Sequence, residues 1–479
     1  MSRRPRILVA ALLLAAAGAA PAFGETAFDP APYLGTRWYG VYLFGEKVGY
    51  GSFRLEEFDD RGDRAFRSVF RVDYRISVGG DRQEMAIREE KIYQPDGELA
   101  AFTSVQESPL GRVSFSGRRE GDVFRVDTAS GERTAPAAGE KLADSLAHLE
   151  LVRANSRPGD SVTVRLFETT LLMPVTVTHT VKEVEERYPG GVRAKIYRIR
   201  TEFPELGLTT SSLIDGELRT IEGKVGMVTI REEEEESAPG TGSGFDLFLA
   251  AAVRPDRRIP RPREIRTLRL KLSGPVEPDP ALNSLRQEFE KIAEDSYYVR
   301  ISSPPARTDQ PPDLPLAGEN FPAELEATAY IQADHSRIRE KAREIIGEEK
   351  NPRRAAELLT GWVFRNLDKS FLAAIPNAVD VLNKKSGDCK AHSVLLVALA
   401  RSLGLPARTV SGLVAMEDGL FYYHQWAELY TGEWTPADPV FGQIPVDAGH
   451  VELSRSGPAQ QLKLLNLIGQ LRIEVLEWE

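Results

Sequence analysis

The chain has 479 residues, of which 42% are hydrophobic and 28% are charged, and its formal net charge is −10. This composition is typical of a folded protein of about three domains, and it excludes a largely disordered or collagen-like chain. One cysteine excludes a disulfide framework and a cysteine-rich metal site, and the acidic balance disfavours nucleic acid as a partner.

The first 24 residues have the pattern of a secretory signal peptide. Three arginines within the first six residues precede an apolar stretch at 7–17, and small residues then lead to Gly24. The apolar stretch is shorter than the ~20 residues that a membrane span needs, which favours a cleaved signal over an N-terminal anchor. We therefore expect cleavage of residues 1–24, a periplasmic or secreted location, and no stable membrane span afterwards.

Residues 33–231 are predicted to form an antiparallel β domain. Apolar and polar residues alternate between 66 and 76, which is the period of a strand with one buried face. Turn residues separate such runs, for example Gly45 after an aromatic stretch and Pro-Asp-Gly at 95–97. Only residues 141–154 have helical spacing. The domain is expected to be either a large curved sheet or an open barrel that closes on one helix.

Two connecting segments are predicted next. Residues 232–244, with five consecutive glutamates followed by a stretch containing Gly and Ser, have the composition of a solvated linker. Residues 245–320 are predicted to bridge the β domain and the C-terminal domain. Within this bridge we expect a strand at 265–272, a helix or loop at 282–292, and a proline-rich connection at 302–322.

Residues 321–479 are predicted to form an α+β domain. A strongly apolar helix begins near Cys389 and ends at Gly404, with a proline shortly beyond it. Further helices are expected at 333–346 and 352–366, and strands at 408–414, 421–430 and 471–478. The predicted fold is therefore multidomain, with an antiparallel β domain followed by an α+β domain.

Cys389, the only cysteine, lies in the first turn of the apolar helix, after Gly387 and Asp388. A helix N-terminus stabilises thiolate over thiol, and its N–H groups can face an oxyanion. A thiol nucleophile also needs a base and an acceptor that orients the base. His424 lies in the middle of a predicted strand and Asp438 follows the next strand. The three side chains can converge if these strands pack antiparallel against the helix.

Three blocks of this sequence resemble those of bacterial transglutaminase-like proteins. They are the cysteine block Gly387-Asp388-Cys389-Lys390-Ala391-His392, the histidine block His424-Gln425-Trp426-Ala427-Glu428 and the aspartate block Trp434-Thr435-Pro436-Ala437-Asp438-Pro439. The resemblance implies a papain-like fold in the C-terminal domain, with Cys389 as nucleophile, His424 as base and later acid, and Asp438 as the acceptor that orients the imidazole. No cofactor and no metal are expected, because the thiol has a simpler use as a nucleophile.

The sequence also suggests a role or an environment for five further polar residues. Glu428 shares the strand parity of the candidate base and is the alternative acid. Asn383 could supply an amide donor to the oxyanion. His392 is expected to be structural, and His335 and His450 are expected to be solvated.

The implied reaction begins with thiolate attack on an amide carbonyl and forms a thioester. Water as the acceptor gives a cysteine peptidase or amidase, which we favour, and an amine gives a transglutaminase. A third hypothesis is a non-catalytic protein whose β domain holds a ligand or partner. Expected substrates are proteins, peptides or peptidoglycan stems.

Overall fold

The structure is a computed structural model that describes residues 28–60, 62–78, 81–108, 111–128, 131–187, 194–238, 247–276, 278, 280–303, 312–316, 320–370, 377–455 and 463–479. The chain divides between Leu247 and Phe248 into two compact units, an N-terminal and a C-terminal one. The predicted signal peptide lies outside the described residues, as do residues 239–246 of the predicted linker. The domain boundaries expected from the sequence stay predictions.

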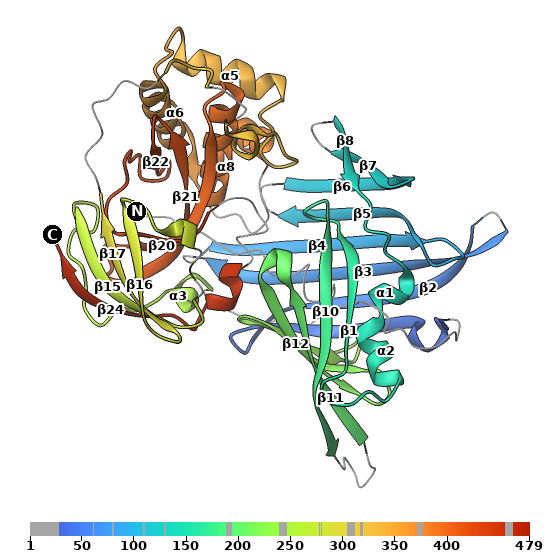
Figure 1. Cartoon of the computed structure of the whole chain (residues 1–479). Coiled ribbons are helices and arrows are strands. Elements are labelled where there is room, and N and C mark those ends of the chain that lie inside the picture. Colours follow the sequence, from blue (N-terminus) through green and yellow to red (C-terminus); the bar gives the residue numbers. More distant parts are fainter. Residues whose placement is uncertain are drawn as a thin grey trace. The chain divides into compact units, whose positions relative to one another are not determined.

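The N-terminal unit is an antiparallel sheet of 14 strands within the described residues, in the order β8-β7-β6-β5-β4-β3-β2-β1-β14-β13-β12-β11-β10-β9 (Figure 1). Neighbours in sequence pair as hairpins, and β1 pairs with β14. The strands are β1 (Gly35–Leu43), β2 (Glu46–Asp60), β3 (Asp63–Val78), β4 (Asp81–Tyr93), β5 (Leu99–Ser108), β6 (Gly111–Glu120), β7 (Val123–Thr128), β8 (Gly131–Pro136), β9 (Ser161–Glu168), β10 (Met173–Arg187), β11 (Ala194–Phe203), β12 (Leu208–Asp215), β13 (Thr220–Val225) and β14 (Val228–Glu233).

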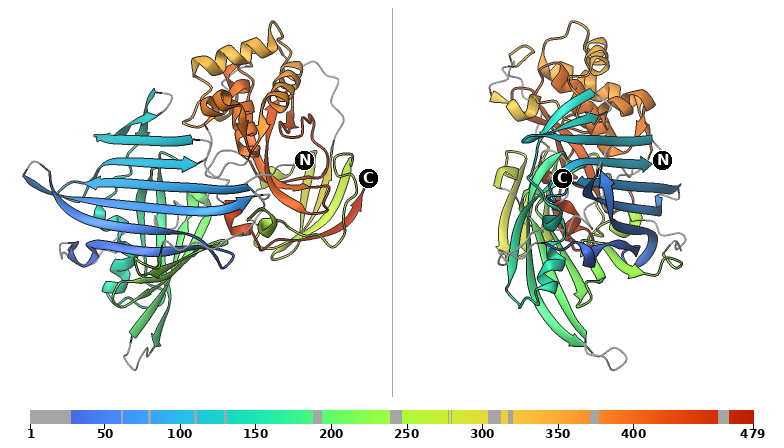
Figure 2. Two further views of the ribbon diagram at one scale, coloured as in Figure 1. Left: turned by 180° about the vertical axis from the view of Figure 1, so that it is seen from behind. Right: turned by 90° about the vertical axis from the view of Figure 1, so that its right-hand side faces the viewer.

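This sheet curls so that strands far apart in the strand order come into contact (Figure 2). Phe167 at the end of β9 packs against Phe102 of β5 and Phe124 of β7, with ring centroids 5.1 and 4.6 Å apart. Lys91 of β4 donates to the carbonyl of Phe167 at 3.0 Å. Helices α1 (Leu142–Ser145) and α2 (Ala147–Arg153) occupy the segment for which the sequence predicts a helix. The predicted antiparallel β fold is therefore confirmed.

The acidic run that was expected in a solvated linker belongs partly to the sheet. Glu232 and Glu233 are the last two residues of β14. Glu233 accepts from Lys47 and from the hydroxyl of Tyr42, both at 2.5 Å, and Glu232 lies 3.6 Å from Arg37. Cross-strand cations thus hold the first two of the five glutamates, which composition alone does not indicate.

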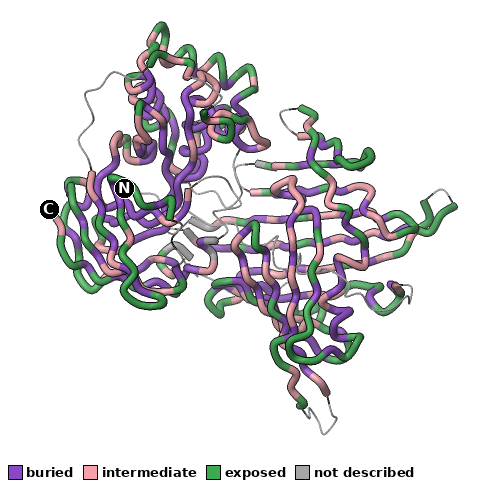
Figure 3. Tube along the Cα trace, in the orientation of Figure 1, coloured by how far each residue is buried: buried purple, intermediate pink, exposed green. Residues whose placement is uncertain are grey.

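In the C-terminal unit, helices pack around α8 and α8 packs on a four-stranded antiparallel sheet in the order β22-β21-β20-β23. Residues 389–400 of α8 are all buried (Figure 3), which explains the strongly apolar pattern of this segment. The elements are α4 (Pro322–Leu325), α5 (Ser336–Ile346), α6 (Pro352–Asn366), α7 (Ala378–Lys384), α8 (Cys389–Ser402), β20 (Ala407–Ala415), β21 (Phe421–Tyr430), β22 (Trp434–Ala437) and β23 (His450–Arg455). The expected α+β fold is confirmed.

A second sheet in this unit, in the order β16-β17-β15-β24, unites the predicted bridge with the C-terminal strand. It consists of β15 (Thr267–Ser273), β16 (Gln287–Ala293), β17 (Ser296–Ser302) and β24 (Arg472–Trp478). The sequence predicts a helix or loop at 282–292, and this prediction is wrong for residues 287–292, which belong to strand β16. Leu285 contributes to the helical spacing of apolar residues in this segment, but it is 89% exposed, so the spacing does not mark a buried helix face. Pairing with β17 instead makes residues 287–293 a strand.

Buried polar contacts join the segment at the start of β16 to strand β23. The Gln287 side chain and the Glu452 backbone exchange two hydrogen bonds, at 3.0 and 2.8 Å. Arg286 lies 3.2 Å from the buried Glu452 carboxylate and donates to the backbone carbonyl of His450. Through these contacts residues of the predicted bridge hold the strand on which His450 lies. In the part of the chain that the structure describes, no helix is long and apolar enough to span a membrane.

Candidate active site

The N-terminus of α8 positions the only cysteine. Asp388 is the N-cap residue, and its Oδ1 accepts from the N–H groups of Lys390 and Ala391 at 3.0 and 3.1 Å. This is the usual role of aspartate before a helix, because the first N–H groups have no acceptor within the helix. Cys389 follows as the first helical residue and is only 4% exposed.

Two contacts place the start of α8 against the middle of β21. The backbone N–H of Gln425 faces the Cys389 sulfur. One helical turn further on, the Ser393 hydroxyl donates to the Gln425 carbonyl at 3.1 Å. The thiol therefore lies beside the residue that follows His424 in the strand.

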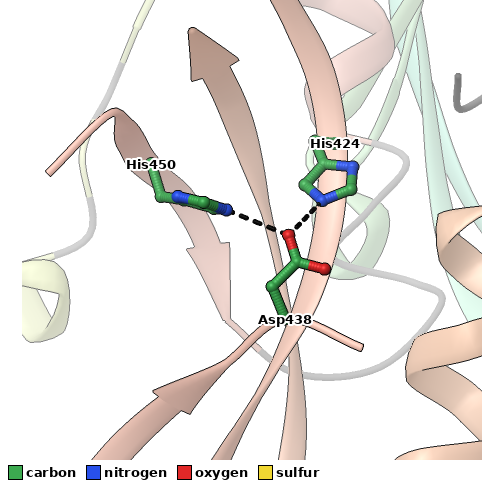
Figure 4. Close-up of side chains that lie close together, drawn as sticks. All are labelled: His424, Asp438 and His450. Atoms are coloured by element: carbon green, nitrogen blue, oxygen red, sulfur yellow. Dashed lines mark hydrogen bonds and ion pairs between the residues drawn. The ribbon is translucent and has the colours of Figure 1, made fainter. Parts of the chain in front are cut away.

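His424 and Asp438 form the hydrogen bond that the sequence predicts for a base and its orienting acceptor. His424 Nε2 lies 2.7 Å from Asp438 Oδ2 (Figure 4), and both residues are buried. In the described part of the chain, the other ring nitrogen, Nδ1, takes part in no hydrogen bond. Asp438 follows β22 and His424 lies on β21, so pairing of these neighbouring strands brings the two side chains together.

Asp438 is held by hydrogen bonds at both oxygens. Oδ1 accepts from the N–H groups of Val440 and Phe441 at 2.6 and 3.2 Å, which fixes the carboxylate against its own loop. Oδ2 accepts from His424 and, at 3.0 Å, from Nε2 of His450. Although burial raises the pKa of Asp438, the two imidazoles hold it well below its ordinary value, so the carboxylate is ionised.

His450 is a residue whose predicted environment was wrong. It was expected to be solvated, yet it is completely buried as the first residue of β23. Its Nδ1 lies 3.1 Å from Asp447 Oδ1, and the Asp447 carboxylate lies 3.0 Å from Arg263. The spacing of Asp447 and His450 was visible in the sequence. Their closeness to Asp438 was not, because it depends on the pairing of β23 with β20.

Burial is the main influence on protonation in this site. It raises the pKa of the Cys389 thiol well above its ordinary value, and the Asp388 carboxylate raises it further. Burial also lowers the pKa of His424, although Asp438 acts in the opposite direction. The sequence predicts a thiolate stabilised by the helix N-terminus. The structure instead favours a neutral thiol and a neutral imidazole, because both groups are shielded from water.

The other candidates from the sequence lie apart from the His424–Asp438 pair. Glu428 accepts from Arg408 at 2.8 Å and lies 3.3 Å from Arg455, so its carboxylate is engaged in ion pairs. His392 is fully buried, and its Nδ1 lies 2.8 Å from the Asp388 carbonyl, which fits a structural residue. Asn383 is exposed on α7, whereas the thiol is buried.

The remaining histidine singled out from the sequence, His335, is the N-cap residue of α5 and is half-buried rather than solvated. Its Nδ1 accepts from the N–H of Arg337 at 3.2 Å.

The His424, Asp438 and His450 side chains also have the composition of a metal site, and their ligand atoms lie within 4.8 Å of one another. Hydrogen bonds already account for each of these contacts, since each imidazole nitrogen that faces Asp438 can carry a proton. We therefore interpret these three side chains as a hydrogen-bonded cluster and assign no metal to it.

Comparison with known proteins identifies the class of this region. Residues 339–439, which include Cys389, His424 and Asp438, match the model of the transglutaminase-like superfamily. The chain therefore carries a transglutaminase-like domain, as the three sequence blocks suggest. An uncharacterized protein of Haemophilus influenzae is 34% identical over 94 residues, which are 19% of this chain and 25% of that protein. The matched part thus spans about a quarter of the length of this relative.

Two solved structures are similar to parts of this chain. A candidate cysteine protease from Cytophaga hutchinsonii is 16% identical with a TM-score of 0.28, and the match covers 45% of this chain and 86% of that one. A protein described as a TGase is 16% identical with a TM-score of 0.18, and the match covers 32% of this chain and 43% of that one. At these values no activity is carried over from either structure.

Proposed function

We propose that this protein is an exported, cysteine-dependent enzyme that attacks amide bonds through a thioester intermediate and acts as a peptidase or amidase. The observation that carries the proposal is the buried His424–Asp438 hydrogen bond, one residue from the strand N–H that faces the Cys389 sulfur. Export rests on the signal-peptide pattern of residues 1–24.

The proposed reaction uses the hydrogen-bond pattern of the site. Asp438 engages Nε2 of His424, which leaves Nδ1 to take the proton from the Cys389 thiol. Sulfur then bonds to the amide carbon, and the oxyanion forms at the helix N-terminus. The N–H of Cys389 has no acceptor within the helix and is the expected donor to this oxyanion. The C–N bond breaks as His424 returns its proton to the leaving amine.

The second half of the reaction decides the name of the enzyme. Water gives its proton to His424 and attacks the thioester, the C–S bond breaks, and the thiol is restored with release of a carboxylic acid. An amine in place of water makes the protein a transglutaminase, which is the alternative. Protein, peptide and peptidoglycan-stem amides are the proposed substrates, and the protein is proposed to act in the periplasm or outside the cell.

A test that needs no substrate is the alkylation of Cys389 by iodoacetamide as a function of pH. Because Cys389 is the only cysteine, every adduct reports this thiol. The wild-type rate should rise with pH in two steps, since the thiol and His424 titrate as a coupled pair. His424→Ala should leave a single step. His335→Ala, which removes a histidine at the start of α5, is the matched control and should keep both steps.

Activity assays then separate the acceptors. The mature protein is incubated with dimethylated casein with and without dansylcadaverine, and new amino groups and fluorescent incorporation are both measured. Hydrolysis without incorporation supports the peptidase, and incorporation supports the transglutaminase. A single-step alkylation profile that His424→Ala leaves unchanged would contradict both. Full biological function of Cys389→Ala in cells would favour a non-catalytic binding protein.

A further inference from the structure

His450 lies between two carboxylates, and each of its ring nitrogens faces one of them. Nε2 is 3.0 Å from Asp438 Oδ2, and Nδ1 is 3.1 Å from Asp447 Oδ1. Figure 4 shows the Asp438 carboxylate between the rings of His424 and His450. His450 and Asp438 are fully buried and Asp447 is 5% exposed. Their hydrogen-bond partners must therefore be other groups of the protein.

Both carboxylates are surrounded by donors and are therefore ionised. Asp438 accepts two backbone N–H groups at Oδ1 in addition to the two imidazoles at Oδ2. Asp447 Oδ1 also accepts the N–H of Gly449 at 2.8 Å, and the carboxylate lies 3.0 Å from Arg263. Burial raises the pKa of Asp447, but His450 and Arg263 outweigh it, and the pKa lies below its ordinary value. Ionised carboxylates only accept hydrogen bonds.

These contacts determine how many protons the two ring nitrogens of His450 carry. A neutral imidazole has one N–H, so its second nitrogen would present a lone pair to a carboxylate oxygen. Two ionised carboxylates at hydrogen-bond distance require an N–H at both nitrogens. We propose that His450 is a positioning residue that carries a proton on each ring nitrogen and holds Asp438 in place for His424. The inference rests on the proposed function, because it deepens the role of the same site.

The proposal puts a fixed positive charge beside the proposed base. The ring centroids of His424 and His450 are 5.9 Å apart, and the charge of His450 acts to lower the pKa of His424. The charged and titratable groups around His450 are Asp438 after β22, Asp447 before β23, His424 on β21, Arg263 before β15, Arg286 before β16, and Glu452 on β23. The pair formed by the Cys389 thiol and the His424 imidazole therefore loses its protons at a lower pH while His450 is charged.

The pH profile of Cys389 alkylation by iodoacetamide tests this charge, because iodoacetamide is itself neutral. His450→Gln replaces a cation with a neutral side chain, so both steps of the profile should move to higher pH by roughly one unit or more. The double variant His450→Gln/Asp447→Asn removes a cation and an anion together. Its profile should return most of the way to that of the wild type.

A neutral His450 gives a different pattern of shifts. His450→Gln then leaves the profile in place, and the double variant moves it to lower pH because only an anion is lost. Either result overturns the proposal. If His424→Ala leaves the pH profile of Cys389 alkylation unchanged, the proposed function is refuted. There is then no catalytic Asp438–His424 pair for His450 to position. A two-step wild-type profile that His450→Gln leaves unchanged refutes the role of His450 alone.

A measurement on the unaltered fold covers the case in which the His450 variants do not fold. Nitrogen-15 spectra of histidine-labelled wild-type protein distinguish an imidazolium from a neutral ring, and the chain has six histidines. The imidazolium of His450 is expected at neutral pH, and its signal should persist in His335→Ala and in Cys389→Ala, in which no thiolate can hold a proton on His424. Six neutral rings in the wild type overturn the proposal.

Discussion

Asp438 is the residue on which the contacts of the candidate site converge. Its two oxygens have separate tasks, because Oδ1 is tied to the backbone N–H groups of Val440 and Phe441 while Oδ2 faces the two imidazoles. The backbone contacts fix the direction of the carboxylate before any substrate arrives. The Oδ2 contacts set which nitrogen of His424 is protonated, and a substitution can remove this second task while it keeps the first.

Asp438→Asn should lower turnover by orders of magnitude while the protein stays folded. The amide oxygen can keep the backbone contacts, so that its NH₂ group meets His424 Nε2 and favours a proton on Nδ1, the nitrogen needed as the base. The corresponding change in a serine triad costs about 10⁴-fold in kcat. We expect a loss of ~10² to 10⁴-fold here, measured as amide hydrolysis, with circular dichroism as the check on folding.

Glu428→Gln is the matched control for this prediction. Glu428 is buried on the same strand as His424, but its ion pairs are with Arg408 and Arg455. Its loss should cost stability and leave kcat within a fewfold of the wild-type value. Abolished turnover in Glu428→Gln together with intact turnover in Asp438→Asn would show that the acceptor is misassigned.

At the residue scale, sequence reasoning found the groups that carry a motif and missed those that do not. Cys389, His424 and Asp438 each lie in a recognisable block, and the structure brings His424 and Asp438 into contact. His450 has no such block around it, and a single histidine near the end of a loop is more often solvated than buried. Its position depends on long-range strand pairing, which local sequence does not encode.

The N-terminus of α8 shows how one element serves both folding and chemistry. Asp388 caps the helix through two hydrogen bonds, which stabilise it in the usual way for an N-cap aspartate. After burial, the same carboxylate is the largest influence that raises the pKa of the Cys389 thiol. The capping oxygen and the negative charge can be removed independently.

Asp388→Asn should keep the cap and speed alkylation of Cys389 at neutral pH. Asparagine is as good an N-cap residue as aspartate, while loss of the charge lowers the pKa of the thiol and raises the thiolate fraction. Asp388→Ala loses the cap as well and should destabilise the protein by about 1 kcal/mol. Alkylation rates and thermal unfolding of the two variants separate these effects. A slower reaction of Asp388→Asn would show that the carboxylate does not oppose thiolate formation.

The elements themselves differed in how well the sequence predicted them. Helix α8 and strand β21 were recognised because their patterns are local: a continuous apolar helix after a cap, and an aromatic strand between turns. Strand β16 was predicted as a helix or loop, because its apolar residues have helical spacing. Strands β8, β13 and β14 carried too few apolar residues to be recognised. These strands are held mainly by their partners in the sheets.

At the scale of the whole molecule, each unit has its own buried core and its own buried charges. In the N-terminal unit, Lys91 is paired with Glu140 at 3.1 Å, whereas Glu168 has Glu89 as a neighbour of like charge. Burial and Glu89 together raise the pKa of Glu168 to about 7. The stability of this unit should therefore depend on pH in the range in which Glu168 titrates.

Raising the pH from about 4.5 to 7 should destabilise the N-terminal unit through Glu168. Its pKa is higher in the folded state than the ordinary 4.5, so the folded form binds the proton more tightly, and this stability is lost as the pH rises to about 7. The shift corresponds to about 3 kcal/mol. Glu168→Gln should remove this loss, as followed by denaturant unfolding at several pH values. An unchanged pH dependence would place the Glu168 carboxylate outside the core.

Limited proteolysis should separate the two units between Ala238 and Phe248. The chain divides between Leu247 and Phe248, and residues 239–244 consist of Pro, Gly, Thr and Ser, a composition typical of linkers. Phe245 gives chymotrypsin a cleavage site in this stretch, whereas the aromatic residues of the sheet are mostly buried. A fluorescent thiol label on Cys389 of the denatured digest marks the C-terminal fragment. We expect one labelled and one unlabelled product, each identified by its mass. Early cuts within β1–β14, with residues 239–247 protected, would contradict this division of the chain.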